Sequence, residues 1–243
     1  MKKFISLLLV LSLCIGTVCV LPACSKEEGP TGNTDAPTLL GGWEINDEDV
    51  EADMPQYAKD AFDRAMEERS KGMLDGDHYI PLAYLGCQFA GNGVNYAYLC
   101  KTAVTDFTLY SSLCVVTVYS GATGSAAMSN VSGVNIADFT ENTDLTFDPA
   151  PIVGGWTLCA DYPAKLSADD QAAFDAATAT LAGAKYTPLA LMGKQVVAGE
   201  NLAFLCCAES VTAEPVRALC VVTVYADLEG NFTVTSIAPF SIA

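Results

Sequence analysis

The sequence predicts an α+β protein built from two copies of one domain, each an antiparallel sheet of four to five strands wrapped across one helix. Three observations predict this fold. Sequence motifs recur after about 100 residues, each copy begins with one helical pattern of apolar residues, and each continues with runs rich in Val, Tyr, Phe and Thr between turn signals. One helix followed by successive strands favours a sheet with the helix across one face.

The repeat is visible as pairs of matching segments. The longest of them, Leu-Cys-Val-Val-Thr-Val-Tyr, begins at Leu113 and again at Leu219. The other pairs begin at Gly41 and Gly154, at Ala61 and Ala173, at Tyr79 and Tyr186, and at Asn95 and Asn201. A unit of this length repeated twice indicates tandem domains rather than a solenoid, whose periods are shorter.

The chain divides into five parts on composition. We predict a lipoprotein signal peptide at 1–23, a flexible tether at 24–38, a first domain at 39–137, a linker at 138–151 and a second domain at 152–243. The tether and the linker are polar and contain Gly or Pro, a composition that does not bury a core.

The first residues have the organisation of a bacterial secretion signal. Lys2 and Lys3 form a basic start, and an apolar stretch follows up to Leu21. The tetrapeptide Leu-Pro-Ala-Cys that ends at Cys24 resembles a lipobox, which implies that Cys24 becomes a diacylated N-terminus. We therefore expect an extracytoplasmic lipoprotein anchored to the cell membrane through Cys24. An ordinary signal peptide or a short membrane helix is the alternative.

The charge balance limits the partners. The formal net charge is −17, and both Lys2 and Lys3 lie in the predicted signal, so the mature chain is more acidic still. A surface of this charge repels nucleic acid and anionic lipid headgroups. We expect no nucleic-acid partner.

The sequence contains no recognisable catalytic pattern. His78 is the single histidine, which makes a His-dependent triad or a His-rich metal site implausible. Paired carboxylates such as Asp169-Asp170 are interpreted as solvated surface, and no phosphate-binding glycine loop is present. We expect a protein that is not an enzyme and has no metal or other cofactor.

Each copy contains one predicted helix. Asp53 is the candidate N-cap of the first, with Gln56 at the capping-box spacing, and Ser167 can cap the second. Gly72 and Gly183 are expected to end the two helices. The apolar stripes comprise Ala58, Ala61, Phe62, Ala65 and Met66 in the first helix and Ala173, Phe174, Ala177 and Leu181 in the second.

In the second copy, two glycines precede the helix and a Val-rich turn follows it. The glycines are Gly154 and Gly155, and the turn opens the segment Gln195–Leu205, which reads Gln-Val-Val-Ala-Gly-Glu-Asn-Leu-Ala-Phe-Leu. This arrangement resembles the cystatins, protein inhibitors of papain-like cysteine proteases. The segment is similar to the first hairpin loop of the family, and the glycines are similar to its N-terminal glycines. Through the internal repeat, the resemblance extends to the first copy.

The resemblance implies a wedge that plugs the active-site cleft of a papain-like cysteine protease. In the family, an N-terminal glycine segment and two hairpin loops lie at one edge of the sheet. The corresponding residues of the second copy are Gly154, Gly155, Gln195, Val196, Val197, Ala198, Gly199 and Leu228. Val196 and Val197 are apolar residues in a predicted turn, and exposed apolar side chains at a loop tip are typical of a partner surface.

The chain departs from the family pattern in both copies. The family often carries a Pro-Trp pair in the second hairpin, whereas Ala226–Asn231 offers only Leu228, between two acids. In the first copy, the hairpin from Ser120 to Asn130 contains Met128 as its one sizeable apolar residue. The first-copy residues that correspond to the wedge are Gly41, Gly42, Gln88, Phe89, Ala90 and Gly91. We expect the second copy to be the better inhibitor and the first to be weak or inactive.

A second interpretation keeps the fold without inhibition. Val-rich strand ends and a turn glycine also arise from β-propensity and turn geometry alone. The chain would then be a non-inhibitory surface lipoprotein that acts as a binding or structural module. For Trp43 and Trp156, which directly follow the glycines, we favour core packing over protease contact.

Two cysteine pairs recur in the repeat. A cystatin-like strand order would place Cys100 beside Cys114 and Cys206 beside Cys220, so that each pair could form a cross-strand disulfide. Buried thiols are the favoured alternative. Cys206 and Cys207 are neighbours on one predicted strand and should point to opposite faces, so we expect only one of them to face the core.

Overall fold

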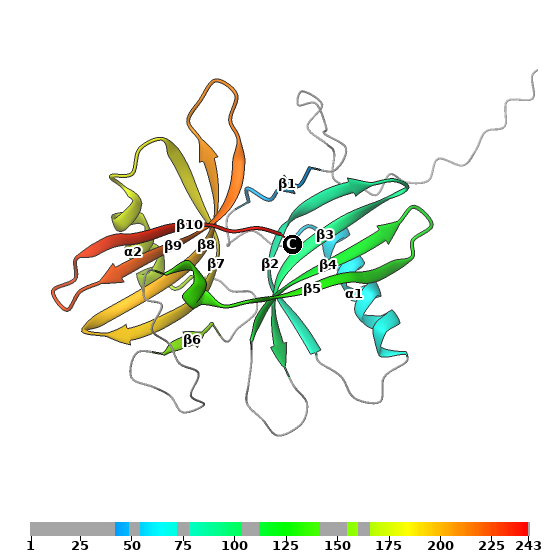
Figure 1. Ribbon diagram of the computed structural model, residues 1–243, viewed down its shortest axis with the longest axis horizontal. Coiled ribbons are helices and arrows are strands. Elements are labelled where there is room, and N and C mark those ends of the chain that lie inside the picture. Colours follow the sequence, from blue (N-terminus) through cyan, green and yellow to red (C-terminus); the bar gives the residue numbers. More distant parts are fainter. Residues whose placement is uncertain are drawn as a thin grey trace, which may run out of the picture.

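The computed structural model describes residues 42–48, 54–71, 78–103, 112–140, 155–159 and 166–242. Within these ranges, each copy forms one five-stranded antiparallel sheet and one α-helix (Figure 1). The α+β class predicted from the sequence is therefore confirmed. The predicted signal peptide, the tether and Cys24 lie outside the described residues, as do Gly41 and Gly154.

The chain order of the strands is also their order in the sheets. The first copy contains β1 (Glu44–Ile45), α1 (Gln56–Ser70), β2 (His78–Ala90), β3 (Gly93–Ala103), β4 (Leu113–Gly121) and β5 (Ala126–Val134), followed by the short 3-10 helix η1 (Ile136–Phe139). The second contains β6 (Trp156–Leu158), α2 (Ala168–Thr178), β7 (Ala184–Val197), β8 (Gly199–Ser210), β9 (Arg217–Ala226) and β10 (Phe232–Pro239). Both sheets are simple meanders.

The predicted helix stripes pack against one face of each sheet. Phe62 of α1 packs edge-on against Tyr98 of β3, with ring centroids 4.9 Å apart. Phe174 of α2 packs in the same way against Phe204 of β8, at 5.0 Å. The two copies thus repeat each other in packing as well as in sequence.

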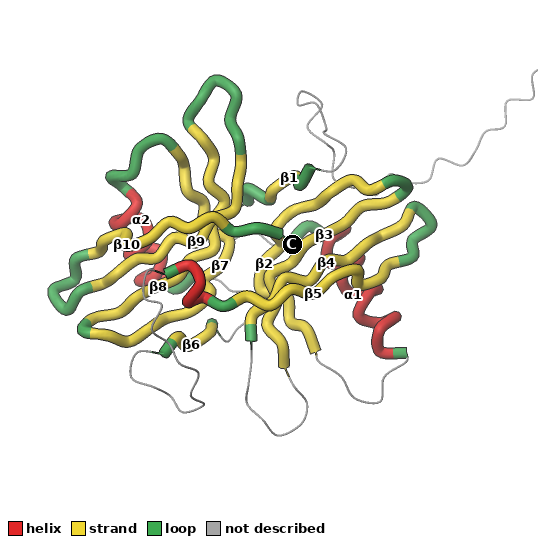
Figure 2. Tube along the Cα trace, viewed as in Figure 1, coloured by secondary structure: helices red, strands yellow, loops and turns green. Residues whose placement is uncertain are grey.

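The other face of each sheet is covered by the other copy. One buried cluster joins β2, β3 and β4 to β7, β8 and β9, with Leu85, Leu99, Met192 and Leu205 at its centre, all fully buried. We call this cluster the intersheet core. The layers therefore run from α1 through two sheets to α2, with the helices at opposite sides and the strands between them (Figure 2).

Both faces of the second sheet carry buried cysteine. Cys206 belongs to the cluster under α2 and Cys207 to the intersheet core, and both are buried. The two side chains point to opposite faces, as expected. The expectation that only one of them faces a core was wrong, because the sheet has a core on each face. The register places Cys100 opposite Cys114 and Cys206 opposite Cys220, and all of these cysteines are free thiols.

Helix α1 does not begin with the predicted capping box. Its N-cap is Pro55, which makes no side-chain capping bond, and Asp53 lies outside the described residues. A residue that precedes proline is disfavoured in the helical region, so the helix cannot continue backwards through Met54. Gly72 also lies outside the described residues.

Helix α2 begins as predicted and ends earlier. Ser167 is the N-cap, and its hydroxyl accepts a hydrogen bond from the Asp170 amide at 3.1 Å. The helix ends at Thr178, so Leu181 and Gly183 belong to the turn that leads into β7. Gly183 adopts a left-handed φ of 94° in that turn, not at the helix end.

The first residues of the predicted linker are folded. Ile136 of η1 is buried in the intersheet core, and the Phe139 ring lies 5.5 Å from that of Phe240. The Phe139 carbonyl also accepts a hydrogen bond from the Ser236 hydroxyl at 3.0 Å. The burial of Ile136, the ring contact and the hydrogen bond together attach the segment after β5 to the second sheet. Residues 141–154 lie outside the described ranges.

Candidate functional site

Three elements of the second copy lie at one end of its sheet. The β7/β8 and β9/β10 turns are at the same end, where Glu200 of β8 lies opposite Ala226 of β9. Gly155 joins them, because the next residue, Trp156, pairs with Gln195 near the end of β7. We call Gly155, Val196–Gly199 and Asp227–Asn231 the second-copy tip; its two turns lie side by side at the left of Figure 1.

Both turns of the second-copy tip carry exposed apolar side chains. Leu228 is 85% exposed, Val196 63% and Val197 38%. Val196 and Val197 end β7 and Leu228 lies in the β9/β10 turn, at the same end of the sheet, and we call these three exposed side chains the apolar ridge. Ala198, which follows Val197, is also exposed.

Gly199 has no space for a side chain. Its φ is +126°, and an added Cβ would overlap the Ala226 carbonyl oxygen and lie 2.9 Å from the Tyr225 ring. The Tyr225 hydroxyl donates a hydrogen bond to the Ala198 carbonyl. The second hairpin therefore braces the first, and only glycine fits at the contact.

Gln195 supports the tip from below. It is 4% exposed, and its Oε1 accepts a hydrogen bond from Asn201 Nδ2 at 2.8 Å across the β7/β8 hairpin. The sequence placed Gln195 among the binding residues. The structure places its side chain beneath the surface, where it holds the two strands together.

Asp227 shapes the second turn. Its Oδ1 accepts hydrogen bonds from the Glu229 and Asn231 amides, each at 2.8 Å, and its Oδ2 accepts one from Asn231 Nδ2 at 2.7 Å. The bonds from Asn231 and from the turn amides lower the pKa of Asp227. An Asx turn of this kind fixes the backbone and leaves Leu228 directed outward.

The corresponding end of the first sheet has the same braces without the apolar ridge. Asn95 Nδ2 donates to Gln88 Oε1 at 3.0 Å, as Asn201 does to Gln195. Gly93 lies against Tyr119, whose hydroxyl would be 2.6 Å from an added Cβ. Gly93 rather than Gly91 is thus the structural counterpart of Gly199. Gly91 instead occupies the two-residue β2/β3 turn, with φ of +58°.

The first-copy turns present small or partly covered side chains. Phe89 and Ala90 are half-buried at the end of β2, and Gly42 is exposed beside them on the β1 side. The predicted hairpin from Ser120 to Asn130 is mostly strand, because β5 already begins at Ala126. At this end of the described first sheet, no large apolar side chain is among the exposed ones.

Both tryptophans that follow the glycines pack inward. Trp43 and Trp156 are partly buried against the intersheet core. This agrees with the core-packing interpretation of these residues. Their position ties the start of each sheet to the shared core.

One predicted surface carboxylate is buried. Asp170 is 7% exposed, and its side chain accepts hydrogen bonds from Lys194 Nζ at 2.6 Å and from the Ser167 hydroxyl at 2.7 Å. The interpretation of Asp169-Asp170 as a solvated pair holds for Asp169 alone, because Asp170 lies at the helix start facing β7. The described residues contain no cluster of His, Cys, Asp or Glu that could hold a metal ion.

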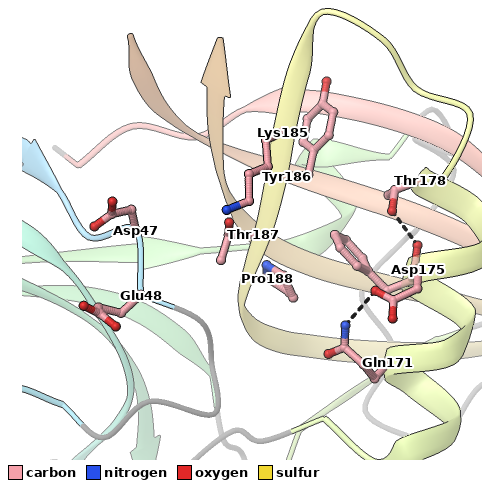
Figure 3. Close-up of a pocket in the computed structure, with 10 residues that line it drawn as sticks. Asp47, Glu48, Gln171, Asp175, Thr178, Lys185, Tyr186, Thr187 and Pro188 are labelled. Carbon is pink, nitrogen blue, oxygen red and sulfur yellow. Dashed lines mark hydrogen bonds between the residues drawn. The ribbon is translucent and has the colours of Figure 1, made fainter. Parts of the chain in front are cut away.

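A pocket of about 350 Å³ lies at the seam between the copies, which no sequence pattern predicts. It is lined by Asp47, Glu48, Gln171, Phe174, Asp175, Thr178, Lys185, Tyr186, Thr187 and Pro188. Figure 3 shows Asp47 and Glu48 on one side, α2 on the other and Lys185 between them. Nearby, Arg217 pairs with Asp47 at 2.6 Å and with Glu209 at 2.7 Å. Of these two ion pairs, Arg217–Asp47 links the copies and Arg217–Glu209 lies within the second sheet. The pocket is at the end of β7 away from the second-copy tip.

No protein-family model matches the chain, and no curated protein matches it. Among the described helices, none is long and apolar enough to span a membrane.

Proposed function

We propose that this chain inhibits papain-like cysteine proteases by inserting the second-copy tip into the active-site cleft. The observation that carries the proposal is the placement of Val196, Val197 and Leu228, exposed on two adjacent turns at one end of a sheet. Gly155 enters the sheet at the same end. A narrow apolar edge of this kind fits a groove better than a flat surface.

The order of elements supports a cystatin-like fold for each copy. Strand β6 after Gly155, a helix, a first hairpin with the Gln195–Gly199 motif and a second hairpin follow one another as the resemblance implies. The cystatin-like assignment belongs to the proposal, together with the protease partner.

The two turns are braced before any partner arrives. Tyr225 bonds to the Ala198 carbonyl, Gln195 bonds to Asn201, and Asp227 closes its own turn. A preorganised surface loses little conformational entropy on binding, so more of the apolar burial contributes to affinity.

We propose one inhibitory tip for each chain. The first-copy turns point away from the second-copy tip, toward the opposite end of the molecule (Figure 1). They carry no exposed apolar ridge among their described residues. The first copy then serves as the support that covers the second sheet. A lipid anchor on Cys24 would hold the chain at the outer side of a membrane.

A non-inhibitory binding or structural module is the second candidate. Gln195 and Gly199 have counterparts in Gln88 and Gly93, in a copy without an apolar tip. Their recurrence is fully explained by the hairpin braces. Two of the motif residues are therefore evidence for the fold, and the exposed valines alone are evidence for a partner.

The experiment is inhibition of papain by the full mature chain, with Cys24→Ser to keep it free of lipid. We expect residual papain activity to fall at micromolar inhibitor or below. The chain should also bind papain whose catalytic thiol has been alkylated, because a wedge fills the cleft without being cleaved. If papain keeps full activity at micromolar concentrations of the chain and alkylated papain does not bind it, inhibition is excluded and the non-inhibitory module is the function that remains.

A further inference from the structure

The most exposed residue of the apolar ridge, Leu228, lies between two carboxylates that pair with no cation of the described residues. Leu228 lies between Asp227 and Glu229, and neither of these acids forms an ion pair with a described residue. Glu229 is exposed, and its amide rather than its carboxylate is used in the turn. The β9/β10 turn thus presents two negative charges beside its most exposed apolar side chain.

Among the described residues, Lys194 is the lysine near the tip, and it does not pair with Asp227 or Glu229. Lys194 Nζ lies 2.6 Å from Asp170 and 3.9 Å from Glu200. Its closer bond is to the buried carboxylate of α2, and its contact with Glu200 at the start of β8 is the longer one. The second-copy tip is therefore an apolar ridge in a negative field.

The first copy shows that this charge is not a requirement of the fold. Its β4/β5 turn, Ala122–Ser125, contains only Ala, Thr, Gly and Ser, and its β2/β3 turn is Gly91-Asn92. The turns of the two copies have equivalent places in equivalent sheets, yet only those of the second combine exposed apolar and acidic side chains. The combination therefore distinguishes the second-copy tip from the corresponding end of the first sheet.

We propose that the second-copy tip selects a protease whose cleft is edged by Lys or Arg where the β9/β10 turn meets it, with Glu229 as the specificity-determining residue. This rests on the proposed inhibitory function. Charges at the rim of an interface act mainly on the association rate and on the choice of partner. A cleft with an acidic edge would place like charges together and be rejected.

Two papain-like proteases, chosen from their own structures for a basic and an acidic cleft edge, test the proposal. Association rate constants are measured for the full mature chain and for Glu229→Gln and Glu229→Lys. We expect Glu229→Lys to slow association with the basic-edged protease by about tenfold and to speed association with the acidic-edged one. Glu229→Gln should lie between them.

A matched control makes the same charge change elsewhere. Glu214 is exposed in the β8/β9 turn, at the other end of the same sheet, and Glu214→Lys should change both rates by less than about twofold. Inhibition in which Glu229→Lys and Glu214→Lys have equal effects would overturn the role of Glu229. Failure of the unmodified chain to inhibit either protease would instead overturn the proposed function on which it rests.

Discussion

The backbone of Gly199 lies against the ring of Tyr225, and the hydroxyl of that tyrosine bonds to the carbonyl of Ala198. The contact joins the two turns of the second-copy tip. In the first copy Gly93 and Tyr119 repeat the close approach. The same close contact between a glycine and a tyrosine therefore recurs at the corresponding end of each sheet.

Replacing Gly199 by alanine should destabilise the protein strongly. The new Cβ would overlap the Ala226 carbonyl oxygen at a φ that alanine rarely adopts, so we expect a loss of about 2–4 kcal/mol in the free energy of unfolding. Gly230→Ala is the matched control, since Gly230 also has positive φ but open space around it, and it should cost about 1–2 kcal/mol. Urea unfolding measures both. Equal costs would show that the close contact is absent.

Asp227 should release the second turn at low pH. Its pKa is lowered in the folded chain, so its turn bonds are present above the ordinary aspartate value of about 3.9 and are lost as the pH falls through the lowered value. The Glu229 and Asn231 amide shifts in NMR spectra should report one titration with a midpoint below that value. Asp227→Asn should abolish the titration. A midpoint at or above the ordinary value would contradict the Asx turn.

The seven described cysteines should be free, and all but one protected from alkylation. Burial raises the pKa of Cys207 and of Cys220 to about 11, and it also raises that of Cys100 and Cys206. At pH 8 in native buffer, iodoacetamide should modify Cys159 first, because it is the only one of the seven that is not buried.

In urea without reductant, mass spectrometry of the Cys24→Ser chain should find all seven labelled. Labelling of only five or three would reveal one or two disulfides. That result would favour the cross-strand pairs Cys100–Cys114 and Cys206–Cys220 over buried thiols.

The two copies should unfold together. Met192 is fully buried in the intersheet core, and Met192→Ala should cost about 2–5 kcal/mol. Because both sheets share that core, tryptophan fluorescence and far-ultraviolet circular dichroism should report one urea transition that moves as a whole. Val216→Ala, at a side chain 68% exposed, should leave it in place. Two transitions, only one of them shifted by Met192→Ala, would mean that the copies fold independently.

Local patterns were sufficient to predict the elements of this fold. The spacing of Ala58, Ala61 and Phe62 identified α1 and its buried face, and Ser167 identified the start of α2. The buried face of α1 and the start of α2 depend on residues that are close together in the chain, so the spacing of those residues in the sequence is enough to predict them. Pro55 shifted the start of α1 because the restriction that proline places on the preceding residue outweighed the capping-box spacing.

The packing of sheet against sheet was missed, although the sequence contained a signal. The β4 run Leu113–Val118 and the adjacent Cys206 and Cys207 do not alternate with polar residues, and strands without such alternation are typically buried on both faces. That the other copy's sheet covers this second face, however, depends on contacts between residues more than 100 apart in the chain, and no local sequence pattern predicts such contacts.

The candidate site was predicted in its position and only partly in its roles. The sequence placed Val196, Val197 and Leu228 at one end, and the structure brings them together. The sequence did not predict that the Gln195 side chain is buried and bonds across the hairpin, or that the Asp227 carboxylate accepts the hydrogen bonds that fix the β9/β10 turn. Both roles depend on hydrogen bonds whose geometry is set by the hairpins rather than by residue type.

The most direct test of the proposed inhibition compares two equal substitutions. Val196→Asp places a charge on the second-copy tip, and Val216→Asp places the same charge on a valine of similar exposure at the far end of the sheet. If the tip enters the papain cleft, the first should weaken inhibition by about 30-fold or more, because the carboxylate loses its water without gaining a partner, and the second should leave it within about twofold. Equal inhibition by the two variants, or none by the unmodified chain, would contradict the account.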